Sequence, residues 1–254
     1  MVTTGEYIDH HLHHLGFSAG AHPFWTFNLD TMIISVILGF MALGFMALVA
    51  RTATVEAPSK WQNAIEMIVE FIENTVKETY HGKIHFVAPL AMTIFIWVFF
   101  MNFMDLIPVD LLPQVLKLFG VEHFKAVPTA DPSLTFALSL SVFVLIIFFN
   151  LRYKGLFGLL KEMFCAPFGP WLFPINFIFR LIEEVVKPLS LSLRLFGNMF
   201  ASEIVFILIA ITPWYAHVTL GLMWSILHIL VITIQAFVFM MLTVVYLNMA
   251  KSAH

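Results

Sequence analysis

A single arginine inside an apolar, membrane-length segment is the most chemically unusual residue of this 254-residue sequence. Arg194 lies near the middle of the segment 187–210, KPLSLSLRLFGNMFASEIVFILIA. The closest carboxylates in sequence are Glu203, nine residues later, and Glu184, ten residues earlier. An arginine in hydrocarbon costs about 2.5–3.5 kcal/mol on insertion scales, and its guanidinium stays protonated. Such a permanent cation indicates a partner outside its own chain or an adjoining water-filled cavity.

A purely structural role for Arg194 is the alternative, either as a snorkelling side chain or as half of a structural ion pair. Against this, small or polar residues follow at one to two helical turns, namely Gly197, Asn198, Ala201 and Ser202. Small side chains let another helix approach closely within a membrane. The pattern therefore predicts that Arg194 faces a packed partner and not lipid.

Three polar residues share one stripe of a second apolar segment, 221–250. His228, Gln235 and Tyr246 are separated by seven and eleven residues, which places them on one face of a helix. A single polar side chain in a span often makes only a helix–helix hydrogen bond, worth about 0.6 kcal/mol on average. Three on one face indicate a polar seam, and we expect this seam to pack against the arginine helix.

Glu203 is a second ionisable residue in the arginine segment. It lies about 13.5 Å from Arg194 along an ideal helix, and nine residues turn the helix by about 180°, so the two side chains point in opposite directions. A carboxylate at this depth is either neutral or hydrated. Together with His228, whose imidazole titrates near neutral pH, Glu203 suits a proton relay. A buried structural pair is the alternative.

The elements that must position these residues are membrane-spanning helices. The mean hydropathy is +0.91 and only 11% of the residues are charged, against about 25% in soluble domains. The length and the apolar stretches predict an all-α integral membrane protein with five transmembrane spans. The last two helices, 175–212 and 221–250, exceed the about 20 residues of a perpendicular span, so we expect both to be tilted.

The chain divides into six segments by composition. These are an extracytoplasmic segment 1–30, a first span 31–50, a cytoplasmic amphipathic segment 51–85, a two-span hairpin 86–150 with an extracytoplasmic loop, a cytoplasmic loop 151–174, and two long tilted helices 175–254. Apolar residues recur at helical spacing among the charges of 51–85, which predicts a helix on the membrane face.

Lysine and arginine counts predict the orientation of the spans. One set of loops and termini carries Arg51, Lys60, Lys77, Lys83, Arg152, Lys154, Lys161 and Lys251, whereas the opposite set carries only Lys117 and Lys125. Because cytoplasmic loops carry the excess of basic residues, we expect an extracytoplasmic N-terminus and a cytoplasmic C-terminus.

The sequence offers little evidence for a metal site, a cofactor or a catalytic centre. The single cysteine, Cys165, excludes an internal disulfide and a cysteine-based metal site. His10, His11, His13 and His14 cluster beside Asp9 and could ligate a metal, but a water-facing polar segment is the simpler interpretation. Neither HExxH nor GxSxG is present. We expect no metal, no cofactor and no catalytic residue.

Several stretches carry a resemblance to one family. KPLSLSLRLFGNMFASE at 187–203 and HILVITIQAFVFMMLTVVYL at 228–247 resemble subunit a of the bacterial F-type ATP synthases, the stator of the membrane-embedded Fo motor. EYIDHHL, APLAMTIFIWVFFMNFMDLIPVDLLP and FPINFIF extend the resemblance over nearly the whole chain. The LRLFGN core is its most specific part.

What the resemblance implies is a non-catalytic, proton-translocating channel subunit of a bacterial inner membrane. Two aqueous half-channels, separated by Arg194, would couple proton flow to rotation of a ring of small hairpin (c-type) subunits, each with a carboxylate at mid-membrane. Further implied partners are b-type peripheral stalk subunits, the F1 head through the complex, and membrane lipid, with no nucleic acid.

The resemblance also assigns residues to the proton path. Those for proton translocation are Arg194, Glu203, His228, Gln235 and Asn198, and the half-channel candidates are Asp30, Asp105, Asp110, Glu183, Glu184 and Tyr246. Some similar proteins carry a carboxylate where Arg180 stands, so the cytoplasmic exit stays open between Glu183 and Glu184. Glu183 and Lys187 also have the i,i+4 spacing of a simple ion pair.

A secondary ion or solute transporter is the alternative function. That class predicts interrupted helices in two related halves, and the sequence shows no internal repeat. The resemblance is to proton-driven members, which favours protons over sodium ions, although the ring largely sets the choice of ion.

Overall fold

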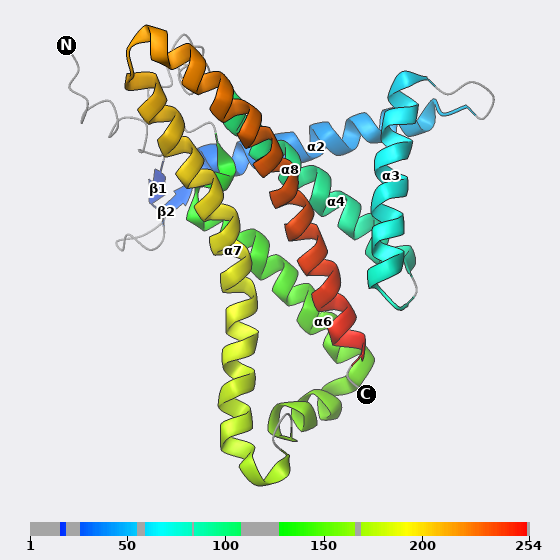
Figure 1. The fold of residues 1–254 in the computed structure, drawn as a ribbon. Coiled ribbons are helices and arrows are strands. Elements are labelled where there is room, and N and C mark those ends of the chain that lie inside the picture. The colour runs from blue at the N-terminus through cyan, green and yellow to red at the C-terminus, as the bar shows by residue number, and fades with distance from the viewer. Residues whose placement is uncertain are drawn as a thin grey trace.

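The structure, a computed structural model of the chain, describes residues 16–18, 26–54, 59–82, 84–107, 127–165 and 169–252. Six long helices make up most of these residues (Figure 1). They are α2 (Leu29–Arg51), α3 (Lys60–Thr79), α4 (Ile84–Phe103), α6 (Pro132–Cys165), α7 (Phe173–Ile211) and α8 (Trp214–Ser252). The shorter elements are the antiparallel strands β1 (Gly16–Ser18) and β2 (Thr26–Asn28) and the 3-10 helices η2 (Met104–Leu106), η3 (Pro128–Ala130) and η4 (Pro170–Leu172).

Five helices of the described chain are long and apolar enough to cross a membrane, which confirms the predicted five-span, all-α architecture. In Figure 1, α7 and α8 diverge like the arms of a V from the short connection that joins them. Each has 39 residues and would be about 58 Å long at 1.5 Å per residue. Since the hydrocarbon core is only about 30 Å thick, neither can stand upright within it. The small β1–β2 ribbon was not predicted.

The third span continues past Asn150, where the sequence analysis placed the start of a loop at 151–174. The chain remains helical to Cys165, so that prediction is wrong over residues 151–165. Gly155 has φ 67° and ψ 170° and produces a kink between two helical pieces, a conformation that glycine adopts without steric penalty. The glycines and charges of this segment therefore mark a bend in the helix and not its end.

The fifth span starts earlier than expected, at Trp214 and not at residue 221. The carbonyl oxygen of Pro213 accepts hydrogen bonds from the backbone N–H groups of Ala216 and His217, at 2.9 and 3.0 Å, and these bonds form the first turn of α8. Proline is well suited to this boundary because its fixed φ suits a helix start. The connection between α7 and α8 is consequently very short.

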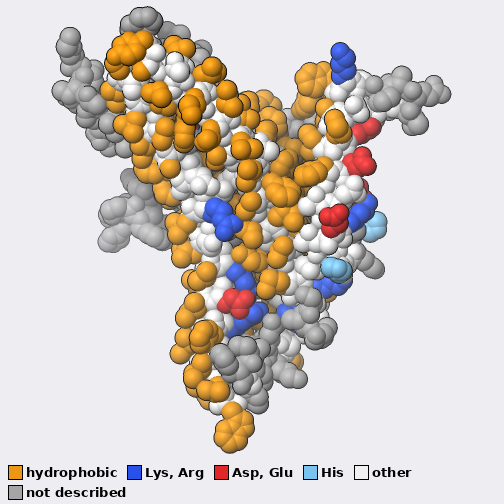
Figure 2. All heavy atoms as spheres, in the orientation of Figure 1, with side chains coloured by type: hydrophobic (Ala, Val, Ile, Leu, Met, Phe, Trp, Pro, Cys, Tyr) orange, Lys and Arg blue, Asp and Glu red, His pale blue; other side chains and the backbone are white. Residues whose placement is uncertain are grey.

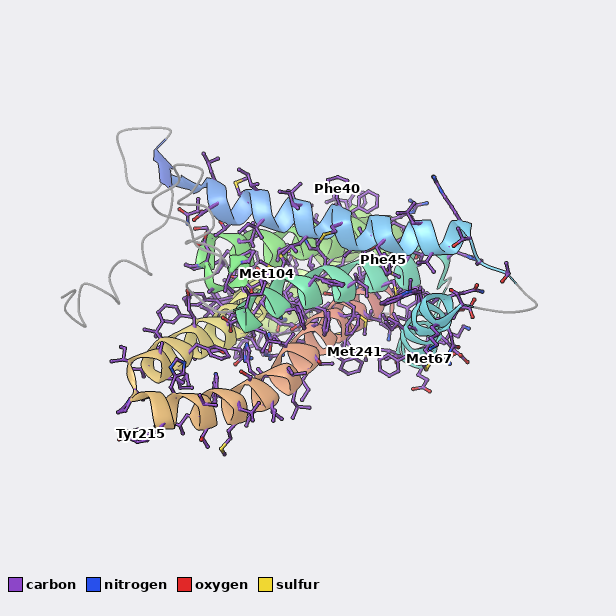
Figure 3. All side chains as sticks on the ribbon, turned by 90° about the horizontal axis from the view of Figure 1, so that it is seen from above. Phe40, Phe45, Met67, Met104, Tyr215 and Met241 are labelled. Carbon is purple, nitrogen blue, oxygen red and sulfur yellow. The ribbon has the colours of Figure 1, made fainter. Side chains whose placement is uncertain are left out.

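The amphipathic helix predicted within 51–85 is α3. The Ser59 hydroxyl accepts a hydrogen bond from the N–H of Gln62 at 3.2 Å and caps the first turn. Ile72 and Val76 are buried against the rest of the chain, and Phe71 contacts Phe237 of α8 with 5.8 Å between ring centroids. Acidic and basic side chains gather on the outer side of α3 in Figure 2. The view in Figure 3 looks almost along its axis, with α2 and α4 alongside.

Asp131 joins the start of α2 to the start of α6. Its buried carboxylate accepts hydrogen bonds from Asn28 Nδ2 at 2.7 Å and from Thr31 Oγ1 at 3.1 Å. It also accepts a bond from the N–H of Ser133 at 2.9 Å and so caps α6. The two helix starts are thereby held side by side at one end of the bundle.

The α2–α4 contact depends on a glycine. The Trp97 indole Nε1 donates a hydrogen bond to the Ser35 carbonyl oxygen at 2.8 Å, and the indole ring then lies against Gly39. A Cβ atom on Gly39 would lie 2.8 Å from Trp97 Cε2. Close approach of two helix backbones needs such a small residue.

We predict that Gly39→Ala lowers the free energy of unfolding by about 1–3 kcal/mol, the usual cost of overpacking, because the bonded indole must move. Gly44 is the matched control on the same helix, since a Cβ there would meet nothing within 4 Å. Gly44→Ala should be neutral or slightly stabilising. Equilibrium unfolding of the detergent-solubilised chain measures both, and equal stabilities of the two variants would contradict the prediction.

Candidate functional site

A buried imidazole joins three elements of the bundle, α7, α8 and η2. His228 of α8 is fully buried, and its Nε2 atom lies 2.7 Å from Oδ2 of Asp105 in η2. Its Nδ1 atom lies 3.0 Å from the hydroxyl oxygen of Ser202 in α7. Trp224 stacks on the imidazole and Phe206 meets it edge-on, with centroid distances of 6.4 and 5.6 Å. The polar contacts are therefore enclosed by aromatic rings.

The arrangement around His228 suits proton exchange. His228 Nε2 lies 2.7 Å from the Asp105 carboxylate, and the Ser202 hydroxyl lies within hydrogen-bond distance of both ring nitrogens, 3.0 Å from Nδ1 and 3.2 Å from Nε2. A hydroxyl can donate to an unprotonated ring nitrogen or accept from a protonated one. If the imidazole gains a proton at Nδ1, the Ser202 hydroxyl can rotate so that its oxygen accepts a hydrogen bond from the new Nδ1–H group. No heavy atom has to move, so the cluster can accept and release a proton in place.

A second polar bridge lies two turns further along α8. The Asn198 Nδ2 of α7 donates a hydrogen bond to Gln235 Oε1 of α8 at 2.6 Å. Further still, Tyr246 lines a small void together with Ser139 and Lys187. The His228, Gln235 and Tyr246 stripe thus faces α7, as the spacing predicted.

Arg194 lies on an exposed face of α7. Within the part of the chain that the structure describes, its guanidinium makes no hydrogen bond and no ion pair. Gly197 and Ala201 are exposed on the same helix, and a Cβ atom on Gly197 would meet nothing within 4 Å. The face around this cation is therefore open to close approach by another helix. Figure 2 shows few charged side chains along α7 and α8, amid a mainly hydrophobic surface.

Glu203 is buried at 3% exposure, whereas Arg194 is exposed, in keeping with the half-turn that separates them. The carboxylate that contacts the His228 ring is nevertheless that of Asp105. We had expected Glu203 to be the partner of His228, with Asp105 elsewhere in a half-channel and Ser202 serving only as a small residue for helix packing.

Two further polar residues lie near the predicted outer end of this path. Asn102 of α4 is fully buried one turn before Asp105, and neither its amide nitrogen nor its oxygen has a hydrogen-bond partner in the described chain. Asp30 is buried at the start of α2 and accepts a bond from the N–H of Thr31 at 2.9 Å. Asp110 lies outside the described residues, as do the N-terminal histidines.

The acidic residues that precede Arg194 belong to a four-membered ion cluster on α7. Arg180 lies 3.0 Å from Glu183 and 3.2 Å from Glu184, and Lys187 lies 3.2 and 2.9 Å from the same two carboxylates. The Glu184 side chain is 21% exposed and that of Glu183 is 44% exposed. Each carboxylate is thus shared between two cations, and Glu184 is the more enclosed.

These features define a class of protein, a multi-span membrane protein with a polar path between its two longest helices. A family model described as ATP synthase A chain matches residues 32–248. The chain is 59% identical to ATP synthase subunit a of Coxiella burnetii (strain CbuK_Q154), with 100% of this chain and 98% of the relative covered. It is 52% identical to that of Alkalilimnicola ehrlichii, covering 98% and 96%, and 47% identical to that of Psychromonas ingrahamii, covering 100% of both. The chain belongs to the ATP synthase A chain family.

We predict that Asp105 and His228 are energetically coupled. Asp105→Asn or His228→Gln alone should lower the free energy of unfolding by about 3–5 kcal/mol, because each leaves a buried partner uncompensated. The double variant should lose less free energy of unfolding than the two single variants together, with a coupling energy of about 0.5–3 kcal/mol. As a control, Gln62→Ala on α3, which shares no partner with His228, should combine additively with His228→Gln. Additive losses for the Asp105 pair in detergent unfolding would refute the coupling.

Proposed function

We propose that the chain is the proton-translocating stator subunit of an F-type ATP synthase, with two half-channels separated by Arg194. Family membership supports a role as the proton channel of the Fo sector. The observation that carries the finer proposal is the cation on the open face of α7, which nothing in the described chain neutralises. A carboxylate on a neighbouring subunit can supply the missing negative charge.

Arg194 acts on each ring carboxylate that comes close to it. A nearby permanent cation lowers the pKa of such a carboxylate and favours its ionised form. The ring site therefore releases its proton on one side of Arg194 and must take up another before it re-enters lipid. One charge that crosses 100 mV is worth about 2.3 kcal/mol, so several protons must be combined to drive one ATP synthesis.

The extracytoplasmic half-channel runs through the seam between α7 and α8. Asp105, His228 and Ser202 form its relay, and the Asn198–Gln235 bridge lies between this relay and the level of Arg194. Asn102 has two buried amide atoms without partners among the described residues, and water in the path would satisfy both. Asp30, Glu203 and Asp110 belong to the same side.

The cytoplasmic half-channel begins beyond Arg194 on α7. Glu184 is our preferred exit residue over Glu183 because its side chain is the more enclosed of the two. Tyr246 and Lys187, a member of this cluster, line one small void. The Arg180 side chain balances the two carboxylates and keeps them in place.

The proposal includes the rest of the assembly. A c-type ring faces Arg194, b-type stalk subunits hold the chain still, and the F1 head carries out the ATP chemistry, so this chain contains no catalytic site. The membrane is the bacterial inner membrane, with the N-terminus outside and the C-terminus in the cytoplasm. The transporter alternative lacks support, because α7 runs through Pro188 as one continuous helix and interrupted helices are typical of that class.

The test of the separator role uses two substitutions at Arg194. Lysine keeps a charge but is a compact ammonium group that can lose its proton when desolvated, unlike guanidinium. We expect Arg194→Lys to assemble normally and to lose ATP synthesis. Arg194→Ala should lose synthesis and ATP-driven pumping but let protons leak down a gradient. Without the positive charge, ring carboxylates would no longer have to release their protons as they pass position 194.

Proton uptake into vesicles stripped of the F1 head, together with ATP-driven pumping in intact vesicles, measures these outcomes. Arg152, a basic residue on α6, provides the control, since Arg152→Lys should leave coupling unchanged. Coupled synthesis in the Arg194→Lys variant would refute the separator role. An assembled Arg194→Ala variant that conducts no protons would refute the leak.

A further prediction concerns Glu203. If its carboxyl group carries protons, Glu203→Gln should reduce proton flux about 100-fold or more, the usual effect of losing an acid–base group, without loss of assembly. Glu203→His should retain more flux than glutamine because imidazole can still exchange a proton. Glu78→Gln, on the exposed side of α3, is the matched control. Wild-type flux in Glu203→Gln would reduce Glu203 to a structural role.

A further inference from the structure

A groove of about 740 Å³ lies between α3 and the first turns of α4. Its floor is apolar and includes Val69, Ile72 and Met92, whereas Glu73, Lys77 and His85 line its polar edge. The volume lies within the range of about 300–1,000 Å³ that is typical of small-ligand sites. The proposed proton path does not use this groove, whose lining residues lie between Val69 and Met92, whereas Arg194 lies on α7.

The position of the groove matches the boundary between water and lipid. Arg51 ends α2 and Ile84 starts α4, and α3 connects the two at the same end of the spans (Figure 1). Met92 lies eight residues into α4, which is about 12 Å along the helix. The groove therefore extends from the polar end of a span down to the depth of lipid chains.

An uncompensated cation lies at the polar end of the groove. Lys251 Nζ donates a hydrogen bond to the His81 carbonyl oxygen and lies 5.6 Å from the Tyr80 ring centroid. Within the described residues it has no carboxylate partner. Burial, and next the hydroxyl of Tyr153, raise the pKa of Tyr80, so its ring stays neutral under the ammonium group.

Gly82 leaves the ammonium group open to the groove. Gly82 is one of the lining residues, and a Cβ atom there would lie 2.7 Å from Lys251 Nζ. Any other residue would fill the space between the groove and the cation. Lys77 adds a second positive charge at this edge, paired with Glu73 at 2.7 Å.

We propose that this groove binds an anionic phospholipid, with the phosphate beside Lys251 and Lys77 and an acyl chain against Val69, Ile72 and Met92. Basic pockets between membrane helices are the usual sites for such headgroups. A zwitterionic lipid would bring its own cation to a site that already has an unpaired one. An apolar helix from another subunit would cover the floor but leave the charge of Lys251 without a counterion.

The test measures lipid retention by the intact complex, purified in mild detergent, by native mass spectrometry. Phosphatidylglycerol, phosphatidylethanolamine and inorganic phosphate are added in separate arms. We expect selective retention of phosphatidylglycerol, weakened about fivefold by Lys251→Gln, the equivalent of about 1 kcal/mol per basic side chain. Lys251→Arg should restore retention, and Lys60→Gln, a lysine of α3 outside the groove, should leave it unchanged.

A second variant tests the apolar floor in case Lys251→Gln fails to assemble. Val69→Trp fills the groove and should abolish selective retention. Val144→Trp places the same side chain on an exposed position of α6 and is the control for added bulk. Equal retention of the two phospholipids, retention of phosphate alone, or unchanged retention in Val69→Trp would each overturn the proposal.

A photo-crosslinking residue at position 69 distinguishes lipid from protein. In the assembled complex it should capture phosphatidylglycerol. Capture of another subunit instead would assign the groove to a protein interface and overturn the lipid site. Neither result bears on the role of Arg194, since proton coupling is measured separately.

Discussion

The rest of the structure depends on one unbalanced charge in a medium of low dielectric constant. A guanidinium group cannot escape burial in lipid by losing its proton, and the described chain provides Arg194 with no counterion. The long helix α7 presents it on a face of small residues, where another helix can come close. The described chain alone therefore leaves this charge unbalanced, and in the proposed function a partner carboxylate balances it. A molecule that uses such an interaction has to hold α7 rigidly while leaving that one face free.

The rigidity comes from polar bridges on the other side of α7. Asn198 bonds Gln235, Ser202 bonds His228, and His228 in turn contacts Asp105. Loss of any one of these partners leaves a polar group where water cannot easily reach it. The same bridges that fix the helix positions also place exchangeable protons in a row. Under the proposed function the same side chains serve both structure and proton conduction, which would explain why the seam is polar although an apolar seam would pack as well.

Composition and periodicity were sufficient to predict the number of spans, because a lipid-facing helix must be apolar over the length needed to cross the bilayer. The α7–α8 seam was also predictable, since His228, Gln235 and Tyr246 repeat at helical spacing. The continuation of α6 beyond Asn150 was not, because Gly155 and the nearby charges resemble a loop and only the backbone geometry shows a kink. The Asp105–His228 contact could not be predicted either. It joins residues from distant parts of the sequence, and nothing local to either residue indicates the other.

The carboxylate of Asp131 has a consequence for how the chain is made. It holds Asn28 and Thr31 at the start of α2 to the start of α6, yet α2 leaves the ribosome long before α6 has been synthesised. During that interval the polar residues at the head of the first span have no permanent partner. Insertion of α2 and its final docking are therefore separate events, and docking waits for the third span to enter the membrane. The packing of α2 against α4 can form once the second span is made, but a chain that stops before α6 leaves the head of the first span without the Asp131 carboxylate.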